Sequence, residues 1–253
     1  MKIIQLSDLH LTTPGRVLHG RDPLQHFQTA VADINTHQRD AALVVISGDL
    51  SDDGSAASYA ALADTLAELQ VPWRVTLGNH DDRAAFLRAF PALADEYGFI
   101  QNVTNLGDHC VIMLDSLQSG DVAGNLCSTR LQWLEDQLRR AQDKAVLLFL
   151  HHPPMPIGLP SLDEVRLAPD AADALHQCCL RYGNVRHIAA GHVHRPASGN
   201  WRGITFSTVR GTNHQSALRF VPGFEVSQET PQYAVFWVTA QGHTVHFNDF
   251  PAL

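Results

Sequence analysis

The stretch Leu43-Val44-Val45-Ile46-Ser47-Gly48-Asp49 contains the pattern that decides the fold. Its first four residues are apolar and favour a buried β-strand, which ends at a glycine followed by a carboxylate. Taken alone, Asp49 could simply cap a turn or a helix. In open α/β sheets, however, ligands bind at the carboxyl ends of strands. The stretch therefore predicts a buried strand of an α/β sheet with a functional carboxylate at its end.

The alternation of short apolar runs with amphipathic stretches extends along the chain and predicts an α/β fold. Strands are expected at residues 2–7, 42–47, 73–77, 109–115, 145–150 and 185–190. Helices are expected to begin at Asp22-Pro23, near Ser55, near Asp82, at Thr129 with a capping box to Gln132, and after Pro169-Asp170. Beyond Gly191 the chain is β-rich, with strands expected at 204–209, 233–239 and 243–250. We expect one domain over residues 1–253, with a β-rich C-terminal part from about residue 200 to 253.

The composition argues against several classes of partner and location. The 253 residues carry a formal net charge of -8 and no cluster of Lys or Arg, which argues against binding of long nucleic acid. No apolar run approaches the roughly 20 residues that a membrane span needs. The N-terminus enters a strand directly, so no cleavable signal peptide is expected. The four cysteines form no C-x-x-C motif, so we expect free thiols and a cytoplasmic location.

Four further strands are followed by side chains that can bind metal ions. The motifs are Asp8-Leu9-His10, Gly78-Asn79-His80-Asp81, His151-His152 and Gly191-His192-Val193-His194. Each one alone has an ordinary explanation, such as a turn with a solvated acid or a Gly-Asn turn before a helix. Together with Asp49 they supply two carboxylates, an amide oxygen and four imidazoles, which is enough for two adjacent ions. A paired-metal site is suited to attack on phosphate esters by metal-bound hydroxide.

These five motifs, in this order, resemble the pattern D-x-H, GD, GNH(D), H and GHxH of the calcineurin-like metallophosphoesterase superfamily. The resemblance covers residues from about 1 to 215 and implies a four-layer α/β/β/α fold, in which two mixed β-sheets form a sandwich flanked by helices. It implies that one ion is bound by Asp8, His10 and His194, and the other by Asn79, His152 and His192. It further implies that Asp49 bridges both ions and that His80 contacts the phosphate or the leaving oxygen. Mixed nitrogen and oxygen ligands favour Fe, Mn, Zn or Co, without deciding among them.

Three stretches, at residues 78–82, 151–158 and 211–215, resemble the bacterial class III cyclic-nucleotide phosphodiesterase and glycerophosphodiesterase branch. That resemblance implies a small phosphodiester substrate contacted by Asn79, His80 and His214. Arg16 and His19, in the loop after the first motif, are further candidate contacts. The motifs contain no Lys or Arg to hold the extra charge of a monoester, which also favours diesters.

Several alternatives remain open. The same site could serve a phosphomonoesterase, a nucleotide pyrophosphatase or a nuclease, although the lack of a basic groove argues against the last. A non-catalytic scaffold would be expected to have lost ligand positions, all of which are filled here. The apolar residues Phe236, Trp237, Val238 and Phe247 predict either a core sheet or a subunit contact, and members of this branch are often oligomeric. We therefore expect a dimer or a larger homo-oligomer.

Overall fold

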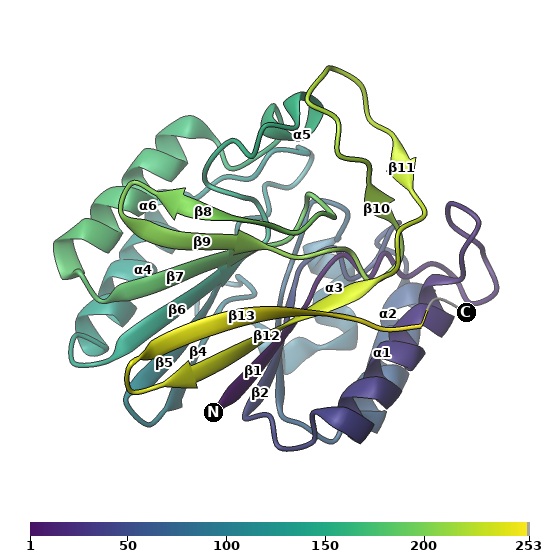
Figure 1. Cartoon of the computed structure of the whole chain (residues 1–253), viewed down its shortest axis with the longest axis horizontal. Helices are drawn as coiled ribbons and strands as arrows, with labels where there is room; N and C mark the ends of the chain where they lie inside the picture. The colour runs from purple at the N-terminus through teal and green to yellow at the C-terminus, as the bar shows by residue number, and fades with distance from the viewer. Residues whose placement is uncertain (252–253) are drawn as a thin grey trace.

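Two mixed β-sheets form the centre of the molecule in the computed structural model, which describes residues 1–251 (Figure 1). The first sheet has the strand order β13-β12-β1-β2-β3. Its parallel strands carry the predicted apolar runs, and β12 and β13 add to them as an antiparallel hairpin. The strands are β1 (Lys2–Leu6), β2 (Leu43–Ser47), β3 (Trp73–Thr76), β12 (Gln232–Thr239) and β13 (Gly242–Asp249).

The second sheet has the order β4-β5-β6-β7-β9-β8, in which the four inner strands are parallel and the two edge strands are antiparallel. Its strands are β4 (Asn102–Leu106), β5 (His109–Leu114), β6 (Ala145–Leu150), β7 (Val185–Ala190), β8 (Ala197–Trp201) and β9 (Ile204–Thr208). A separate two-stranded pair, β10 (Gln215–Ser216) and β11 (Val226–Ser227), projects beyond it. The sequence did not predict β4 or β8, because these edge strands are only partly buried and lack an apolar run.

Helices cover the outer face of each sheet. The first sheet carries α1 (Pro23–His37), α2 (Ala56–Glu68) and α3 (Arg83–Ala89), and the second carries α4 (Ser128–Arg140) and α6 (Pro169–Tyr182). The facing sides of the two sheets form a third apolar layer, in which the rings of Phe149 and Phe236 lie 5.3 Å apart. This four-layer arrangement confirms the predicted α/β/β/α fold.

Most of the predicted helix starts are confirmed by capping hydrogen bonds. Asp22, Ser55 and Asp82 each accept a backbone N–H from the first turn of α1, α2 and α3. The predicted capping box at Thr129 is wrong, because α4 begins at Ser128 and Cys127 occupies the cap without a side-chain bond.

The remaining structural expectations have mixed outcomes. The four cysteines are free thiols, as predicted. No helix formed by residues 1–251 is long and apolar enough to span a membrane. In the C-terminal hairpin, Phe236 and Val238 are buried between the sheets, whereas Trp237 and Phe247 are exposed. The cytoplasmic location and the homo-oligomer stay predictions.

Candidate metal centre

The predicted motifs meet where the two sheets approach each other. Strands β1, β2 and β3 end side by side in one sheet, and β6 and β7 end opposite them in the other. Backbone bonds extend the pairing of β1 and β2 beyond the strands, from Asp8 N to Gly48 O at 3.0 Å and from His10 N to Asp49 O at 2.9 Å. The loops that follow these strands therefore hold their side chains in a common space between the sheets.

The backbone of this region adopts an unusual conformation. Seven non-glycine residues among residues 1–251 have a positive φ, and five of them are predicted ligands with φ between 47° and 68°. These five are Asp8, His10, Asp49, His192 and His194. A left-handed backbone costs free energy for a residue with a Cβ, and such residues concentrate at functional sites. The strain is thus concentrated at the residues that the sequence assigned to metal binding.

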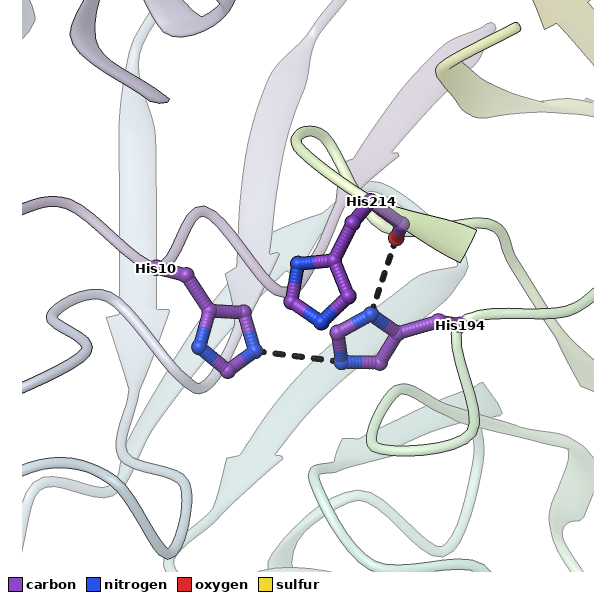
Figure 2. A group of neighbouring side chains, drawn as sticks. All are labelled: His10, His194 and His214. Atoms are coloured by element: carbon purple, nitrogen blue, oxygen red, sulfur yellow. Dashed lines mark hydrogen bonds between the residues drawn. The ribbon is translucent and has the colours of Figure 1, made fainter. Parts of the chain in front are cut away.

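A first group of possible ligands consists of Asp8, His10, Asp49 and His194, whose ligand atoms all lie within 4.8 Å of one another. His194 Nε2 lies 3.1 Å from His10 Nε2 and 3.3 Å from Asp8 Oδ1. His194 Nδ1 donates to the backbone oxygen of His214 at 2.9 Å, as Figure 2 shows. Such a bond at one ring nitrogen directs the lone pair of the other into the centre, as in metal-binding histidines.

A second group of side chains lies on the other side of Asp49. His151 Nε2 lies 3.2 Å from Asn79 Oδ1 and 3.3 Å from Asp49 Oδ2, while His151 Nδ1 donates to Ser47 O at 2.8 Å. His192 completes this group, and its backbone N donates to Asp8 Oδ1 at 3.0 Å. Asp49 therefore belongs to both groups, as a bridging ligand would.

His151 and His152 differ in what their ring nitrogens contact. His152 lies within reach of the second group, but its Nδ1 bonds to Ser116 Oγ at 2.8 Å and its Nε2 donates to Val122 O at 3.2 Å. A neutral imidazole with both nitrogens engaged has no lone pair left for an ion. The position that the sequence assigned to His152 is thus better matched by His151, whose Nε2 faces two oxygens. The sequence could not separate the two, because they are adjacent and of the same type.

The residues present fit a pair of metal ions. Two buried atoms of the possible ligands, Asp8 Oδ2 and His192 Nε2, have no hydrogen-bond partner among residues 1–251. A buried carboxylate oxygen and a buried imidazole nitrogen without hydrogen-bond partners are each costly unless a ligand satisfies them. Mixed imidazole, carboxylate and amide donors are also the set that transition-metal ions prefer.

The electrostatics of the centre support the same interpretation. Burial would raise the pKa of Asp8, but the neighbouring His194 outweighs it and brings the pKa down to about 2. Burial likewise opposes the nearby His151 at Asp49, and the net effect holds the pKa of Asp49 well below its usual value. Burial lowers the pKa of His192 to about 3. Burial also acts to lower the pKa of His151 and of His194, but Asp49 raises the pKa of His151 to about 9 and Asp8 raises that of His194. The carboxylates are therefore already in the ionised state that binds metal ions, whereas His151 and His194 would release a proton when an ion binds.

Asp81 supports the centre without facing it. It is buried, and its carboxylate accepts hydrogen bonds from four groups of the surrounding loops, at distances of 2.9 to 3.1 Å. The donors are the backbone N–H groups of Leu50, Ser51 and Gly78 and the hydroxyl of Tyr59. These bonds tie the loop after β2 to the loop after β3, so that Asp49 and Asn79 keep their relative positions.

A cavity of about 220 Å³ opens above the two groups. Side chains of both groups line its floor, and His19, His80 and His214 line its rim. The remaining side is an apolar wall formed by Val122, Leu162, Val165 and Phe224. The sequence did not predict this wall, since its members lie in segments without periodicity. A second cavity of about 410 Å³ adjoins the first and shares Asn79 and His80 with it.

Of the predicted substrate contacts, Asn79, His19, His80 and His214 line the cavity and Arg16 does not. His80 is 42% exposed at the mouth, its backbone N donates to Asp49 Oδ1 at 2.9 Å, and its Nδ1 lies 3.1 Å from Asp52 O. The ring of His214 lies 4.4 Å from the rings of both His194 and His19, so these three converge on the cavity.

Arg16 lies outside this group. Its side chain is 58% exposed, pairs with Asp53 at 3.3 Å and does not line the cavity. The structure therefore does not bring Arg16 together with the other predicted contacts. The loop that carries it does contribute His19, which the sequence had selected on equal grounds.

The chain is similar in sequence to a protein-family model and to several named phosphodiesterases. A family model described as calcineurin-like phosphoesterase matches residues 1–196, a range that contains every predicted ligand. The chain is 39% identical over 252 residues to a probable cyclic nucleotide phosphodiesterase from Rhodopseudomonas palustris, which covers 97% of this chain and 91% of the relative. It is 32% identical over 256 residues to a probable glycerophosphodiester phosphodiesterase from Arcobacter nitrofigilis, and this alignment covers 97% of this chain and 92% of the relative. Both kinds of enzyme in the expected branch are thus among its relatives.

Solved structures of low sequence identity share the fold. A dimetal phosphatase from Danio rerio superposes with a TM-score of 0.70 at 17% identity, covering 99% of each chain. A purple acid phosphatase from yellow lupin superposes with a TM-score of 0.65 at 14% identity, covering 98% of this chain and 51% of that one. These similarities support the architecture of two packed sheets.

Proposed function

The chain belongs to the calcineurin-like phosphoesterase family, and from this premise we propose that it is a dinuclear-metal phosphodiesterase acting on small phosphodiesters. The observation that carries the proposal is the position of Asp49, whose carboxylate lies between two sets of buried ligand atoms. Relatives named as phosphodiesterases of cyclic nucleotides and of glycerophosphodiesters support the substrate class.

We assign the ligands from the distances between their atoms. Asp8, His10 and His194 would hold one ion, and Asn79, His151 and His192 the other, with Asp49 shared between them. This assignment replaces His152 with His151. The donors favour Fe, Mn, Zn or Co over Mg or Ca, which prefer oxygen ligands alone. When bound, such a pair of ions would clamp the phosphate and lower the pKa of a coordinated water molecule.

The side chains at the mouth have complementary roles. The bond between His80 Nδ1 and the backbone oxygen of Asp52 leaves His80 Nε2 facing the cavity. A protonated His80 can therefore donate to the leaving oxygen while its ring stays oriented. His19 and His214 approach the same space from the other side and can donate hydrogen bonds to the phosphate oxygens.

The preference for diesters rests on the charge of the cavity. No Lys or Arg is among the described residues that line it, and Arg16 is directed to Asp53 instead. A phosphate monoester carries nearly two negative charges and is usually held by Lys or Arg. A singly charged diester matches this lining better. The same argument disfavours the phosphomonoesterase, pyrophosphatase and nuclease alternatives.

A kinetic panel tests this proposal. Purified protein loaded with Mn²⁺, Zn²⁺, Co²⁺ or Fe²⁺ should hydrolyse bis(4-nitrophenyl) phosphate and natural diesters faster than 4-nitrophenyl phosphate. The Asn79→Ala variant should lose this turnover while its circular dichroism spectrum stays unchanged. Faster turnover of the monoester would contradict the diester assignment, and full activity of the variant would contradict the ligand assignment.

A further inference from the structure

The apolar wall is built from three segments that are far apart in the sequence, and the loop between β5 and α4 contributes Val122. Leu162 and Val165 come from the short helix α5 (Pro160–Asp163) and the turn after it, and Phe224 comes from the loop between β10 and β11. Figure 1 shows α5 beside that loop at one edge of the molecule. The backbone N of Gly223 donates to Ser161 Oγ at 3.0 Å and joins these last two segments next to Phe224.

The loop that carries Phe224 is anchored at its base. Strands β10 and β11 pair through Gln215 and Ser227, and Ala217 N donates to Glu225 O at 2.9 Å. Because β10 directly follows His214, this hairpin supplies an imidazole at its base and the Phe224 ring in its loop, and both line the same cavity. One substrate bound on the metal centre would therefore meet both.

Phe224 is 53% exposed although it lines the cavity. A large exposed aromatic side chain at a site mouth gains free energy when a ligand covers it. The four side chains of the apolar wall carry no hydrogen-bonding group. They therefore cannot replace the water molecules that solvate a polar alcohol group of a phosphodiester substrate. A glycerol arm bears hydroxyl groups that would lose their hydrogen bonds against this surface. A nucleobase has an apolar face that stacks on an aromatic ring.

We propose that the apolar wall binds the base of a cyclic nucleotide, that Phe224 stacks on this base, and that the protein therefore prefers cyclic nucleotides to glycerophosphodiesters. This inference rests on the proposed function, because it requires the phosphate to lie on the metal centre. It also predicts little discrimination between adenine and guanine. The two bases differ at their edges, whereas stacking uses the face that both possess.

The test compares Phe224→Ala with a matched control in the same loop. Phe220 is 67% exposed, packs near Gly158 and does not line the cavity, so Phe220→Ala removes the same side chain from a neighbouring position. Phe224→Ala should raise KM for cyclic AMP and cyclic GMP together by about 5- to 160-fold, the range that the loss of one base–aromatic stack produces. KM for glycerophosphoethanolamine should stay within about twofold, since no stack is lost. Phe224→Trp should recover the low KM, and Phe220→Ala should not change it.

A binding measurement separates this inference from the proposed activity. Calorimetric titration of the metal-loaded protein with AMP and with inorganic phosphate reports on the wall without turnover. Phe224→Ala should weaken the binding of AMP by a similar factor and leave that of phosphate unchanged. If the wild-type protein hydrolyses no diester but binds AMP in this Phe224-dependent way, the activity proposal fails and the wall proposal stands. An equal loss for both diester classes, an unchanged KM for cyclic AMP, or an effect on only one purine would overturn the wall proposal.

Discussion

The floor and the apolar wall of one cavity are built in opposite ways. The floor consists of side chains that directly follow five strands, and almost all of them are buried and hydrogen-bonded by neighbouring loops. The wall consists of four apolar side chains on exposed or half-exposed segments, and a hydrogen bond from Gly223 N to Ser161 Oγ joins the segments of Phe224 and Leu162. The difference indicates that the sheets hold the residues that determine the reaction, whereas the loops hold the residues that determine which substrate is preferred. Substitutions in the floor should therefore abolish function, and those in the wall should retune it.

The largest effect is expected at Asp49, which lies with Asp8, His10 and His194 in the first group and contacts His151 of the second. Asp49→Ala removes a ligand from each ion, and the loss of metal-based stabilisation of the transition state is expected to cost about 10³- to 10⁴-fold in kcat. Elemental analysis should show fewer than two ions per chain. Added metal should raise the Tm of the wild-type protein but have little effect on that of the variant, since ligands stabilise the state that binds them. Two tightly bound ions in Asp49→Ala would contradict the bridging role.

The second prediction compares two adjacent residues of the floor. His151→Ala should lose one ion and about 10²- to 10³-fold in kcat, because Nε2 of His151 faces Asn79 and Asp49. His152→Ala removes a residue that contacts Ser116 and Val122 and should cost only about 10-fold, as expected for a residue that supports the ligands. Metal content and kcat of both variants decide the question. If His152→Ala loses the ion and His151→Ala keeps it, the assignment made from the sequence is correct and the one made from the geometry is wrong.

The contrast between floor and wall also explains how much could be predicted from the sequence. Asp8, Asp49, Asn79 and His192 were predictable because each follows an apolar strand, and the carboxyl ends of such strands converge in an α/β sandwich. The choice between His151 and His152 was not predictable, because it depends on which ring contacts a carbonyl of the other sheet.

The wall could not be predicted for a different reason. Leu162 and Phe224 lie in turn-rich segments with no helical or strand periodicity, and they meet only in the folded chain. Local patterns carry no signal for such a long-range contact. The edge strands β4 and β8 were missed on similar grounds, since edges need no continuous apolar run.

A third prediction tests how tightly the side chains of the floor pack around Gly78. A Cβ on Gly78 would collide with the carboxylate and backbone N of Asp49 and would lie 2.7 Å from His151 Cε1. Gly78→Ala should therefore displace both side chains and reduce kcat by about 100-fold, the cost of a misplacement of roughly 1 Å at a reacting centre. The control is Gly120→Ala, at a glycine with open space around it at the edge of the adjoining cavity. Gly120 has a positive φ, so a modest loss of stability is expected there without a loss of bound metal. Unchanged kcat in Gly78→Ala would show that the floor is more compliant than the packing indicates.

The smallest effect is expected on the stability of the wall. Phe224 and Phe220 are more than half exposed, so Phe224→Ala and Phe220→Ala should each change the free energy of unfolding by about 0.5 kcal/mol or less. Urea denaturation of the metal-free proteins measures this directly, without a contribution from bound ions. A loss of several kcal/mol on removal of Phe224 would mean that the loop between β10 and β11 is part of the core rather than an adjustable surface. A KM change in that variant would then reflect unfolding of the loop, and the distinction between a fixed floor and a tunable wall would no longer hold.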